Sequence, residues 1–298
     1  MERYYKKWFT ILVLPAVFLF ALVILVPFVM GVVYSFTSWR GTYFKGVEHW
    51  YQAGVWFENY IEAFKTVRFR EAFIYTIKFT LVAVLVVNVV SLTISIMLTK
   101  INKGVGVLRA IFFMPNLLGG LALGFIWQFI FQIVFSQILF GPEGFLHIDA
   151  LCNMTQDSTK ALFALVIMAT WQMAGYMMLI YINGLNNIPT DLYEAAEIDG
   201  CNSSQKFINI TFPMLMPSFT IVFFLTLANC FKLLDMNVAL TNGDFNTRLL
   251  ALQILRTTRD AAPPNYGLAQ AQAVIFFILI ATVTLIQVSI TKKREVEA

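Results

Sequence analysis

The chain has 298 residues, of which 59% are hydrophobic and only 13% are charged, and its mean hydropathy is +0.73. Such a composition excludes an ordinary soluble domain and predicts an all-α integral membrane protein. The net charge of +4 is small and the basic residues lie mostly at the ends of apolar segments, so nucleic acid is not an expected partner.

Six apolar stretches are each long enough for a membrane-spanning helix, which needs about 20 residues. They cover residues 9–36, 75–99, 109–136, 161–183, 214–234 and 271–291. The first is too long for the core of a signal peptide and shows no cleavage pattern, so we expect it to be a transmembrane helix. No repeat or low-complexity tract is evident, and we expect a single transmembrane domain over residues 1–298.

Basic residues indicate the orientation of these helices. They flank the first, second and sixth stretches on what would be one side of the membrane, at Lys6, Lys7, Lys100, Lys103, Arg109, Lys292, Lys293 and Arg294. By the positive-inside rule this side is cytoplasmic, so both termini are predicted in the cytoplasm. The loop 37–74 carries basic residues as well, so the charge pattern is not one-sided. With six spans, the polar loop after the fourth span is also cytoplasmic.

The outer loop 37–74 is rich in aromatic residues, namely Trp39, Trp50, Tyr51, Trp56, Phe57 and Tyr60. We favour a membrane-interface aromatic belt, and a docking surface for a partner protein is the alternative. In the third stretch, Gly120 and Gly124 form a Gly-x-x-x-Gly pattern, which predicts close contact with another helix.

The sequence carries no recognisable catalytic motif. It lacks a phosphate-binding Gly-x-x-x-x-Gly-Lys-Ser/Thr loop, a Gly-x-Ser-x-Gly elbow and a His-Glu-x-x-His pair. The three cysteines, Cys152, Cys201 and Cys230, lie far apart, and there are only two histidines. We therefore expect no catalytic residue, no disulfide framework, no metal site and no cofactor. If the chain takes part in a process driven by ATP, another subunit must bind the nucleotide.

The polar loop 190–213 lies between the fourth and fifth stretches. Pro189 ends the preceding helix, Thr190 is the expected cap of a short helix, and Gly200 ends that helix. Either Asn202 or Ser203 can cap a second short helix. Two helices joined at a glycine form a hinge that can transmit force to the spans on either side.

After this hinge, Pro213 marks the return of the chain into the bilayer. In the first short helix, Leu192, Ala195, Ala196 and Asp199 recur at spacings of three and four residues and share one face. The two alanines would let another protein surface come close. This face is predicted to dock a partner.

The pattern Glu194-Ala195-Ala196, then Asp199-Gly200, Phe207, Ile210 and Pro213, resembles the EAA loop of ABC importer permeases. In that family the loop seats in a cleft of a separate ATPase subunit. The resemblance implies that the residues coupling this chain to the ATPase are Leu192, Glu194, Ala195, Ala196, Asp199 and Gly200.

Other segments resemble the same family. The matching motifs are Phe113-Met114-Pro115-Asn116, Trp171-Gln172, Gly175-Tyr176, Gly184-Leu185 and Ile188-Pro189. Over nearly its whole length the chain is similar to the carbohydrate-uptake permeases of binding-protein-dependent ABC importers, of the maltose and glycerol-3-phosphate type. Cys201, where alanine is usual, and Phe212, where leucine is usual, are small departures.

The resemblance implies the type I ABC importer permease fold, with six transmembrane helices and a cytoplasmic coupling helix, in a bacterial cell membrane. It implies as partners a second permease in a heterodimer, two ATP-binding subunits, an extracytoplasmic solute-binding protein and a sugar or oligosaccharide as substrate. The long outer loop 235–270 would meet the solute-binding protein.

A transported solute needs polar and aromatic groups at membrane depth. The candidates are Asn88, Ser91, Trp127, Gln128, Trp171, Gln172, Tyr176, Thr226 and Asn229. Aromatic faces beside amide groups suit a sugar, whereas interhelical hydrogen bonds are the structural alternative for each residue. We prefer Gln172, Tyr176 and Asn229, because resemblance to the maltose-type permeases places sugar contacts in the same two helices.

Lys232 and Asp235 lie three residues apart at the predicted outer end of the fifth span. We expect them to form a mutual pair that extends toward the membrane surface, and not a site for a charged substrate.

Other functions are open. The same machine could carry another polar solute, such as a glycerophosphodiester. A secondary transporter working without ATP would need buried ion-coupling carboxylates, and no Asp or Glu lies within a predicted span. An intramembrane enzyme would need a convergent acid, base and nucleophile, which we do not find.

Overall fold

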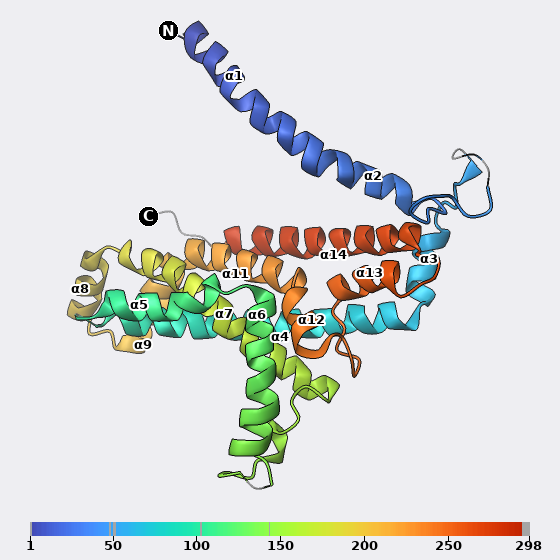
Figure 1. Ribbon diagram of the computed structural model, residues 1–298. Coiled ribbons are helices and arrows are strands. Elements are labelled where there is room, and N and C mark those ends of the chain that lie inside the picture. Colours follow the sequence, from blue (N-terminus) through green and yellow to red (C-terminus); the bar gives the residue numbers. More distant parts are fainter. Residues whose placement is uncertain (1, 48, 50–51, 102, 143, 294–298) are drawn as a thin grey trace. The chain divides into compact units, whose positions relative to one another are not determined.

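The computed structural model describes residues 2–47, 49, 52–101, 103–142 and 144–293. Trp50, Tyr51 and Arg294, which were singled out above, lie outside these residues. The described residues form helices and two isolated β-bridges, in agreement with the predicted all-α class (Figure 1). Within the described residues, five helices are long and apolar enough to cross a membrane, or six if one bent pair counts as a single span.

The chain forms two compact units. The first comprises residues 2–69 and 254–278, and the second comprises residues 70–253 and 279–293. Three helices contribute residues to both units, namely α4 (Val67–Thr99), α13 (Leu250–Arg259) and α14 (Tyr266–Lys292).

In the first unit, the N-terminal elements are α1 (Glu2–Phe20), the π-helical segment η1 (Ala21–Leu25), α2 (Val26–Ser35) and α3 (Glu58–Lys65). The side-chain amide of Asn59 donates hydrogen bonds to the main-chain oxygens of Ser35 at 2.8 Å and Thr37 at 2.9 Å. Carbonyls at the end of a helix lack helical partners. Asn59 therefore satisfies the C-terminal end of α2 and holds α3 against it.

Two aromatic residues of the predicted belt project from the turn before α3. Trp56 and Phe57 are 75% and 63% exposed. This exposure is compatible with a membrane-interface belt and with a docking surface, so both interpretations remain predictions.

The second unit contains most of the remaining elements. In chain order they are α5 (Val105–Phe113), η3 (Met114–Leu117), α6 (Gly120–Phe129), the π-helical η4 (Ile130–Leu139), η5 (Asp149–Leu151), α7 (Ser158–Asn186), α8 (Thr190–Ile198), α9 (Ser203–Lys206), η6 (Phe207–Thr211), α10 (Phe212–Met214), α11 (Met216–Phe231) and α12 (Asp235–Thr241). The second, fourth and sixth predicted spans lie within the single helices α4, α7 and α14.

The fifth predicted span is bent. Residues 203–214 and α11 meet at an angle of 68° across Leu215, soon after Pro213. Pro213 was predicted to mark the return into the bilayer, and the bend follows it within two residues.

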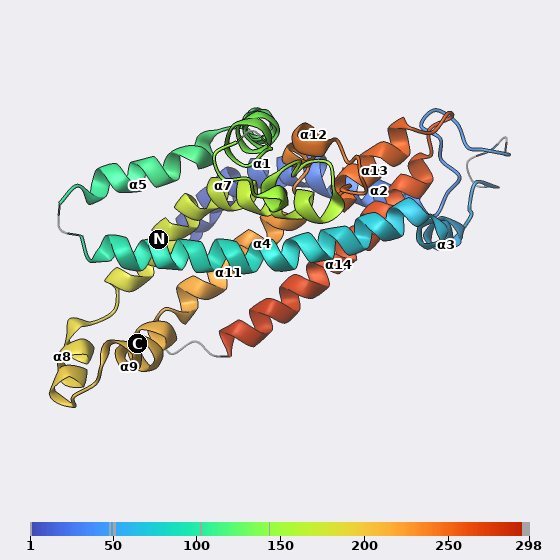
Figure 2. The same ribbon diagram turned by 90° about the horizontal axis from the view of Figure 1, so that it is seen from below.

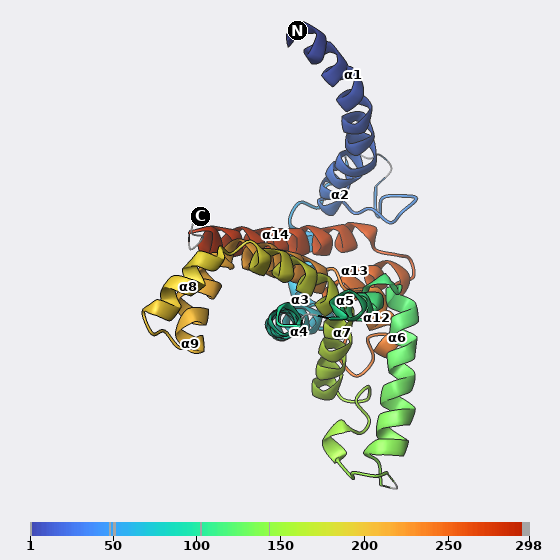
Figure 3. The same ribbon diagram turned by 90° about the vertical axis from the view of Figure 1, so that its left-hand side faces the viewer.

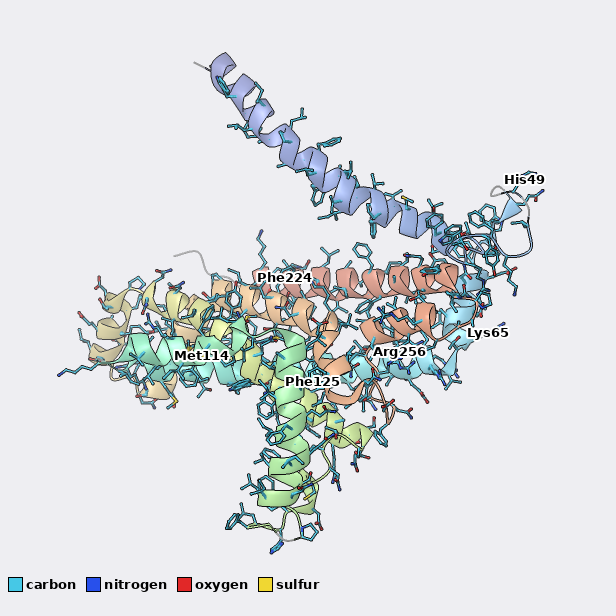
Figure 4. All side chains as sticks on the ribbon, viewed as in Figure 1. His49, Lys65, Met114, Phe125, Phe224 and Arg256 are labelled. Carbon is cyan, nitrogen blue, oxygen red and sulfur yellow. The ribbon has the colours of Figure 1, made fainter. Side chains whose placement is uncertain are left out.

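The prediction of one continuous helix over residues 109–136 is wrong. The helical path stops at Leu117, and Leu118 and Gly119 are extended before α6 begins. Figures 1 and 3 show α6 running across the direction of α5. Pro115 lacks a main-chain N–H, and Gly119 is a poor helix former. Hydropathy cannot detect such a break, because apolar side chains lie on both sides of it, such as Met114 and Phe125 (Figure 4).

Small residues bring the helices of the second unit close together. A Cβ added to Gly124 would lie 2.5 Å from the Cβ of Ala239, and one added to Gly120 would lie 3.0 Å from the Cβ of Asp235. This confirms the predicted close contact of the Gly-x-x-x-Gly pattern and identifies α12 as its partner. A Cβ on Gly175 would overlap the main-chain carbonyl of Phe112, so α5 and α7 touch through their backbones.

We predict that Gly175→Ala lowers the thermal stability of the purified chain, because the backbone of Phe112 cannot move aside like a flexible side chain. Overpacking of this kind costs about 1–3 kcal/mol. Gly106→Ala in α5 is the matched control, since a Cβ there meets no atom within 4 Å. Thermal unfolding of both variants in the same detergent measures the difference, and equal stability of the two would contradict the close backbone contact.

Candidate functional site

The polar loop 190–213 forms two short helices joined at a glycine, as predicted. Gly200 has a φ of +75°, the left-handed conformation that ends α8. The side chain of Asn202 accepts a hydrogen bond from the N–H of Gln205 at 2.9 Å, and the side chain of Gln205 accepts one from the N–H of Asn202 at 2.8 Å. These reciprocal bonds form a capping box at the start of α9. Asn202, and not Ser203, is therefore the cap.

The start of α8 differs from the prediction. Thr190 is the first helical residue and not the cap, and the N-cap residue, Pro189, has no side-chain hydrogen bond. The first N–H groups of α8 therefore have no side-chain cap, and at an exposed helix start water can bond them.

Side-chain bonds connect the two arms of this loop. Lys206 Nζ lies 2.6 Å from Glu197 Oε1, and Tyr193 Oη lies 2.9 Å from Thr211 Oγ1. The hydrogen bond from Lys206 and its positive charge lower the pKa of Glu197 below the ordinary value. The ion pair joins α8 to α9, and the hydrogen bond of Tyr193 joins α8 to η6. Figures 2 and 3 show α8 and α9 together at one end of the second unit, beyond α7 and α11.

The exposed face of α8 is not quite the predicted one. Leu192, Glu194, Ala195, Asp199 and Gly200 are exposed. Ala196, which was also predicted to lie on the docking face, is only 7% exposed. Its side chain therefore packs against other residues of the same chain.

Ile198, which the sequence analysis missed, is 87% exposed. Leu192, Ala195 and Ile198 follow one another at a spacing of three residues and form an exposed apolar stripe, which we call the α8 stripe. The three-residue spacing was visible in the sequence. The outward direction of Ile198 was not, because it depends on which side of α8 the rest of the chain covers.

A polar cavity of about 450 Å³ lies where α6, α7, α11 and α12 meet. Its lining residues are Asn116, Gly120, Gln172, Met173, Asn229, Lys232, Leu233, Leu234, Asp235 and Met236. The structure thus brings together Gln172 and Asn229, two of the three predicted substrate-binding residues. Tyr176 does not line this cavity. It follows Gln172 by one turn of α7, on the side toward α8, and is 39% exposed.

The break in the third predicted span builds this cavity. The side-chain amide of Gln172 donates a hydrogen bond to the carbonyl oxygen of Leu118 at 3.2 Å, which satisfies a main-chain group released by the break. Gly120, at the start of α6, lets the side chain of Asp235 approach. Asn116 also faces the cavity, and the sequence analysis did not include it among the pathway candidates.

The interpretation of Lys232 and Asp235 as a mutual pair is wrong. α11 ends at Phe231 and α12 begins at Asp235, so the two residues do not share a helix face. Within the described part of the chain they form no ion pair with each other. Both residues line the polar cavity instead.

Several other candidates have structural partners. Tyr181 Oη donates to Asn88 Oδ1 at 2.7 Å in the buried core, and the Asn88 amide donates to the carbonyl of Val84 at 2.7 Å. Ser91, Thr226 and Gln128 donate to main-chain oxygens within 3.4 Å. For these residues the structural alternative is the better interpretation. Trp127 and Trp171 form an edge-to-face contact, with ring centroids 5.7 Å apart.

Comparison with known protein families identifies the family of this chain. The family described as "Binding-protein-dependent transport system inner membrane component" matches residues 92–296. The chain belongs to this family. The resemblance to permeases of binding-protein-dependent ABC importers is thereby confirmed. The permease is a component of a transporter in the cell membrane and not an enzyme.

Two relatives match over nearly the full length of the permease. The probable starch degradation products transport system permease protein AmyD of Thermoanaerobacterium thermosulfurigenes is 39% identical over 302 residues, which cover 99% of this chain and 98% of that protein. The multiple sugar-binding transport system permease protein MsmF of Streptococcus mutans is 32% identical over 297 residues, which cover 98% and 97%.

The fold of the permease matches a solved structure. A chain of a bacterial ABC transporter involved in the import of the acidic polysaccharide alginate superposes with a TM-score of 0.79 over 98% of both chains, at 13% identity. At this identity the likeness concerns the fold.

We predict different effects for two tyrosines of α7. Tyr181→Phe removes the buried hydrogen bond to Asn88 and should lower the stability of the permease by about 0.6–2 kcal/mol. Tyr176→Phe, the matched control, changes an exposed side chain and should leave the stability unchanged. Thermal unfolding in detergent distinguishes the two, and a loss of stability in Tyr176→Phe alone would reverse the assignment.

Proposed function

We propose that this permease is one of two membrane subunits of an ATP-driven importer for a sugar or oligosaccharide. The observation that carries the proposal is the 39% identity, over 99% of the chain, with a permease named for starch degradation products. The second membrane subunit is a related permease. Two ATP-binding subunits supply the energy, and a solute-binding protein delivers the cargo from outside.

In this assembly the permease crosses the membrane six times, with both termini in the cytoplasm. The bent pair formed by residues 203–214 and α11 is the fifth span, and α5 with η3 and α6 is a broken third span. The loop of α8 and α9 then lies in the cytoplasm, within reach of an ATPase. The basic residues Lys100, Lys103 and Lys292 at the same side support this orientation.

The α8 stripe and the exposed residues Glu194, Asp199 and Gly200 form the surface that the ATPase grips. Apolar side chains at a spacing of three residues suit insertion into a groove. Because Ala196 is buried, its role is to let α8 pack against its own chain. The ion pair between Lys206 and Glu197 and the hydrogen bond between Tyr193 and Thr211 connect the arms of the loop, so that a displacement of one arm is passed to the other.

Movement of the loop reaches the cavity through two helices. α7 and α11 are in tight contact where they approach the loop, because Gly184 leaves no space for a Cβ next to Ser218. Gln172 lies 14 residues before the end of α7, a distance of about 21 Å along a rigid helix. Closure of the ATPase pair therefore moves Gln172 on α7 and Asn229 on α11, and the cavity opens outward to receive the cargo.

The cavity suits a sugar. The amides of Asn116, Gln172 and Asn229 can each donate and accept hydrogen bonds, as hydroxyl groups do. Tyr176, one turn nearer the loop, lies farther along the route that a sugar would take on leaving the cavity.

The first test of this function is uptake by the permease reconstituted with its neighbouring permease, ATPase and solute-binding protein. We expect ATP-dependent uptake of labelled maltodextrins and a reduction of about tenfold in Gln172→Ala and Asn229→Ala, since each variant loses hydrogen bonds to the cargo. Met173→Leu, which keeps an apolar cavity wall, is the control. Uptake without ATP would favour a secondary transporter. Uptake of glycerophosphodiesters in place of sugars would identify a phosphodiester as the cargo.

The second test concerns coupling. Gly200→Pro forces a φ near −65° where the loop needs +75°, so the angle between α8 and α9 is lost. We expect uptake to fall at least about tenfold while ATP hydrolysis continues, a size typical of coupling between two sites. Gly200→Asn is the control because asparagine tolerates the left-handed conformation. Uptake equal to wild type in Gly200→Pro would refute the coupling role.

A further inference from the structure

We propose that Lys232 and Asp235 are specificity-determining residues, which together hold the hydroxyl groups of an uncharged cargo and exclude charged ones. The proposal rests on the function above, because it concerns the same cavity. It adds a selection by charge, which neither residue was expected to perform while the two were interpreted as a pair near the membrane surface.

The position of the two residues is the first argument. They lie at the two ends of the break between α11 and α12, where the polar cavity is also lined by Gln172 and Asn229. Within the described residues Lys232 and Asp235 form no ion pair, and both line the polar cavity. Their charges are therefore available to a cargo.

The second argument is that each residue lies at a helix end of opposite partial charge. Lys232 follows the last residue of α11, a helix of 16 residues whose C-terminal carbonyls favour a positive charge. The Asp235 side chain lies against Gly120, the first residue of α6, where main-chain N–H groups without helical partners favour a carboxylate. Because Gly120 has no side chain, Asp235 can lie close to it: a Cβ added to Gly120 would be 3.0 Å from the Cβ of Asp235.

The third argument is chemical. A hydroxyl group can donate to the carboxylate of Asp235 and accept from the ammonium group of Lys232, so a polyhydroxylated cargo satisfies both. The two charges sum to zero. An anionic group placed next to Asp235, or a cationic group placed next to Lys232, meets a like charge, which an uncharged cargo avoids. The cavity thus favours an uncharged sugar over a sugar acid, an amino sugar or a phosphodiester.

The experiment measures binding to the assembled transporter in lipid nanodiscs, trapped with its cavity open outward and without the solute-binding protein. Three probes differ in one group: maltotriose, its terminal uronic acid and its terminal amino derivative. We expect the wild type to bind maltotriose at least about tenfold more tightly than either charged probe. Asp235→Asn should raise the affinity for the uronic acid relative to maltotriose about tenfold, and Lys232→Met should do the same for the amino derivative.

Conservative variants separate charge from shape. Asp235→Glu and Lys232→Arg keep the charges and should keep the wild-type preference. Gly120→Ala displaces Asp235 and should shift the preference in the same direction as Asp235→Asn, by a smaller factor. ATP hydrolysis by each variant verifies that the complex is assembled.

The outcomes distinguish the two proposals. If the wild type binds none of the three probes, the sugar function fails. If maltotriose binds and the preferences of Asp235→Asn and Lys232→Met stay within about twofold of wild type, the sugar function stands and the selection by charge is overturned. The selection by charge is also overturned if Asp235→Glu and Lys232→Arg lose the preference as fully as the neutral variants.

Discussion

Main-chain groups that lose their helical partners cannot be left in lipid, and this constraint shapes the centre of the permease. The helical path stops at Leu117 and resumes at Gly120, which releases the carbonyl of Leu118. The amide of Gln172 satisfies it at 3.2 Å. A helix break is tolerated where it is covered by protein or lines a cavity, and here it does the latter. The same hydrogen bond fixes the position of a side chain that we assign to the cargo.

Close packing of small residues makes this arrangement of helices around the cavity possible. Gly124 brings α6 against Ala239 of α12, and Gly175 brings α7 against the backbone of α5. In lipid, helices gain little from apolar burial, so van der Waals contact between closely approaching backbones replaces it. These contacts set the direction of α6 and α12, and thereby decide which polar groups face one another.

The loop of α8 and α9 has a different requirement. For the coupling role that we propose, it must be stiff within itself and well connected to α7 and α11. The capping box at Asn202, the left-handed Gly200 and the ion pair between Lys206 and Glu197 supply the stiffness. Because the loop lies outside the apolar segments, ordinary capping and electrostatic rules apply to it, and most of its local structure was predictable.

The sequence by itself determined the elements that depend on local chemistry. Hydropathy located α4, α7 and α14, and glycine and capping preferences located the ends of α8 and α9. The family followed from motifs that lie close together in the chain. Only the tertiary structure decided that the third predicted span is broken, and that Ala196 is covered whereas Ile198 is exposed. It also decided that Gln172 and Asn229 share a cavity with Lys232 and Asp235 but not with Tyr176. The physical reason is that hydropathy and capping act over a few neighbouring residues, whereas the lining of a cavity depends on how helices distant in sequence cross.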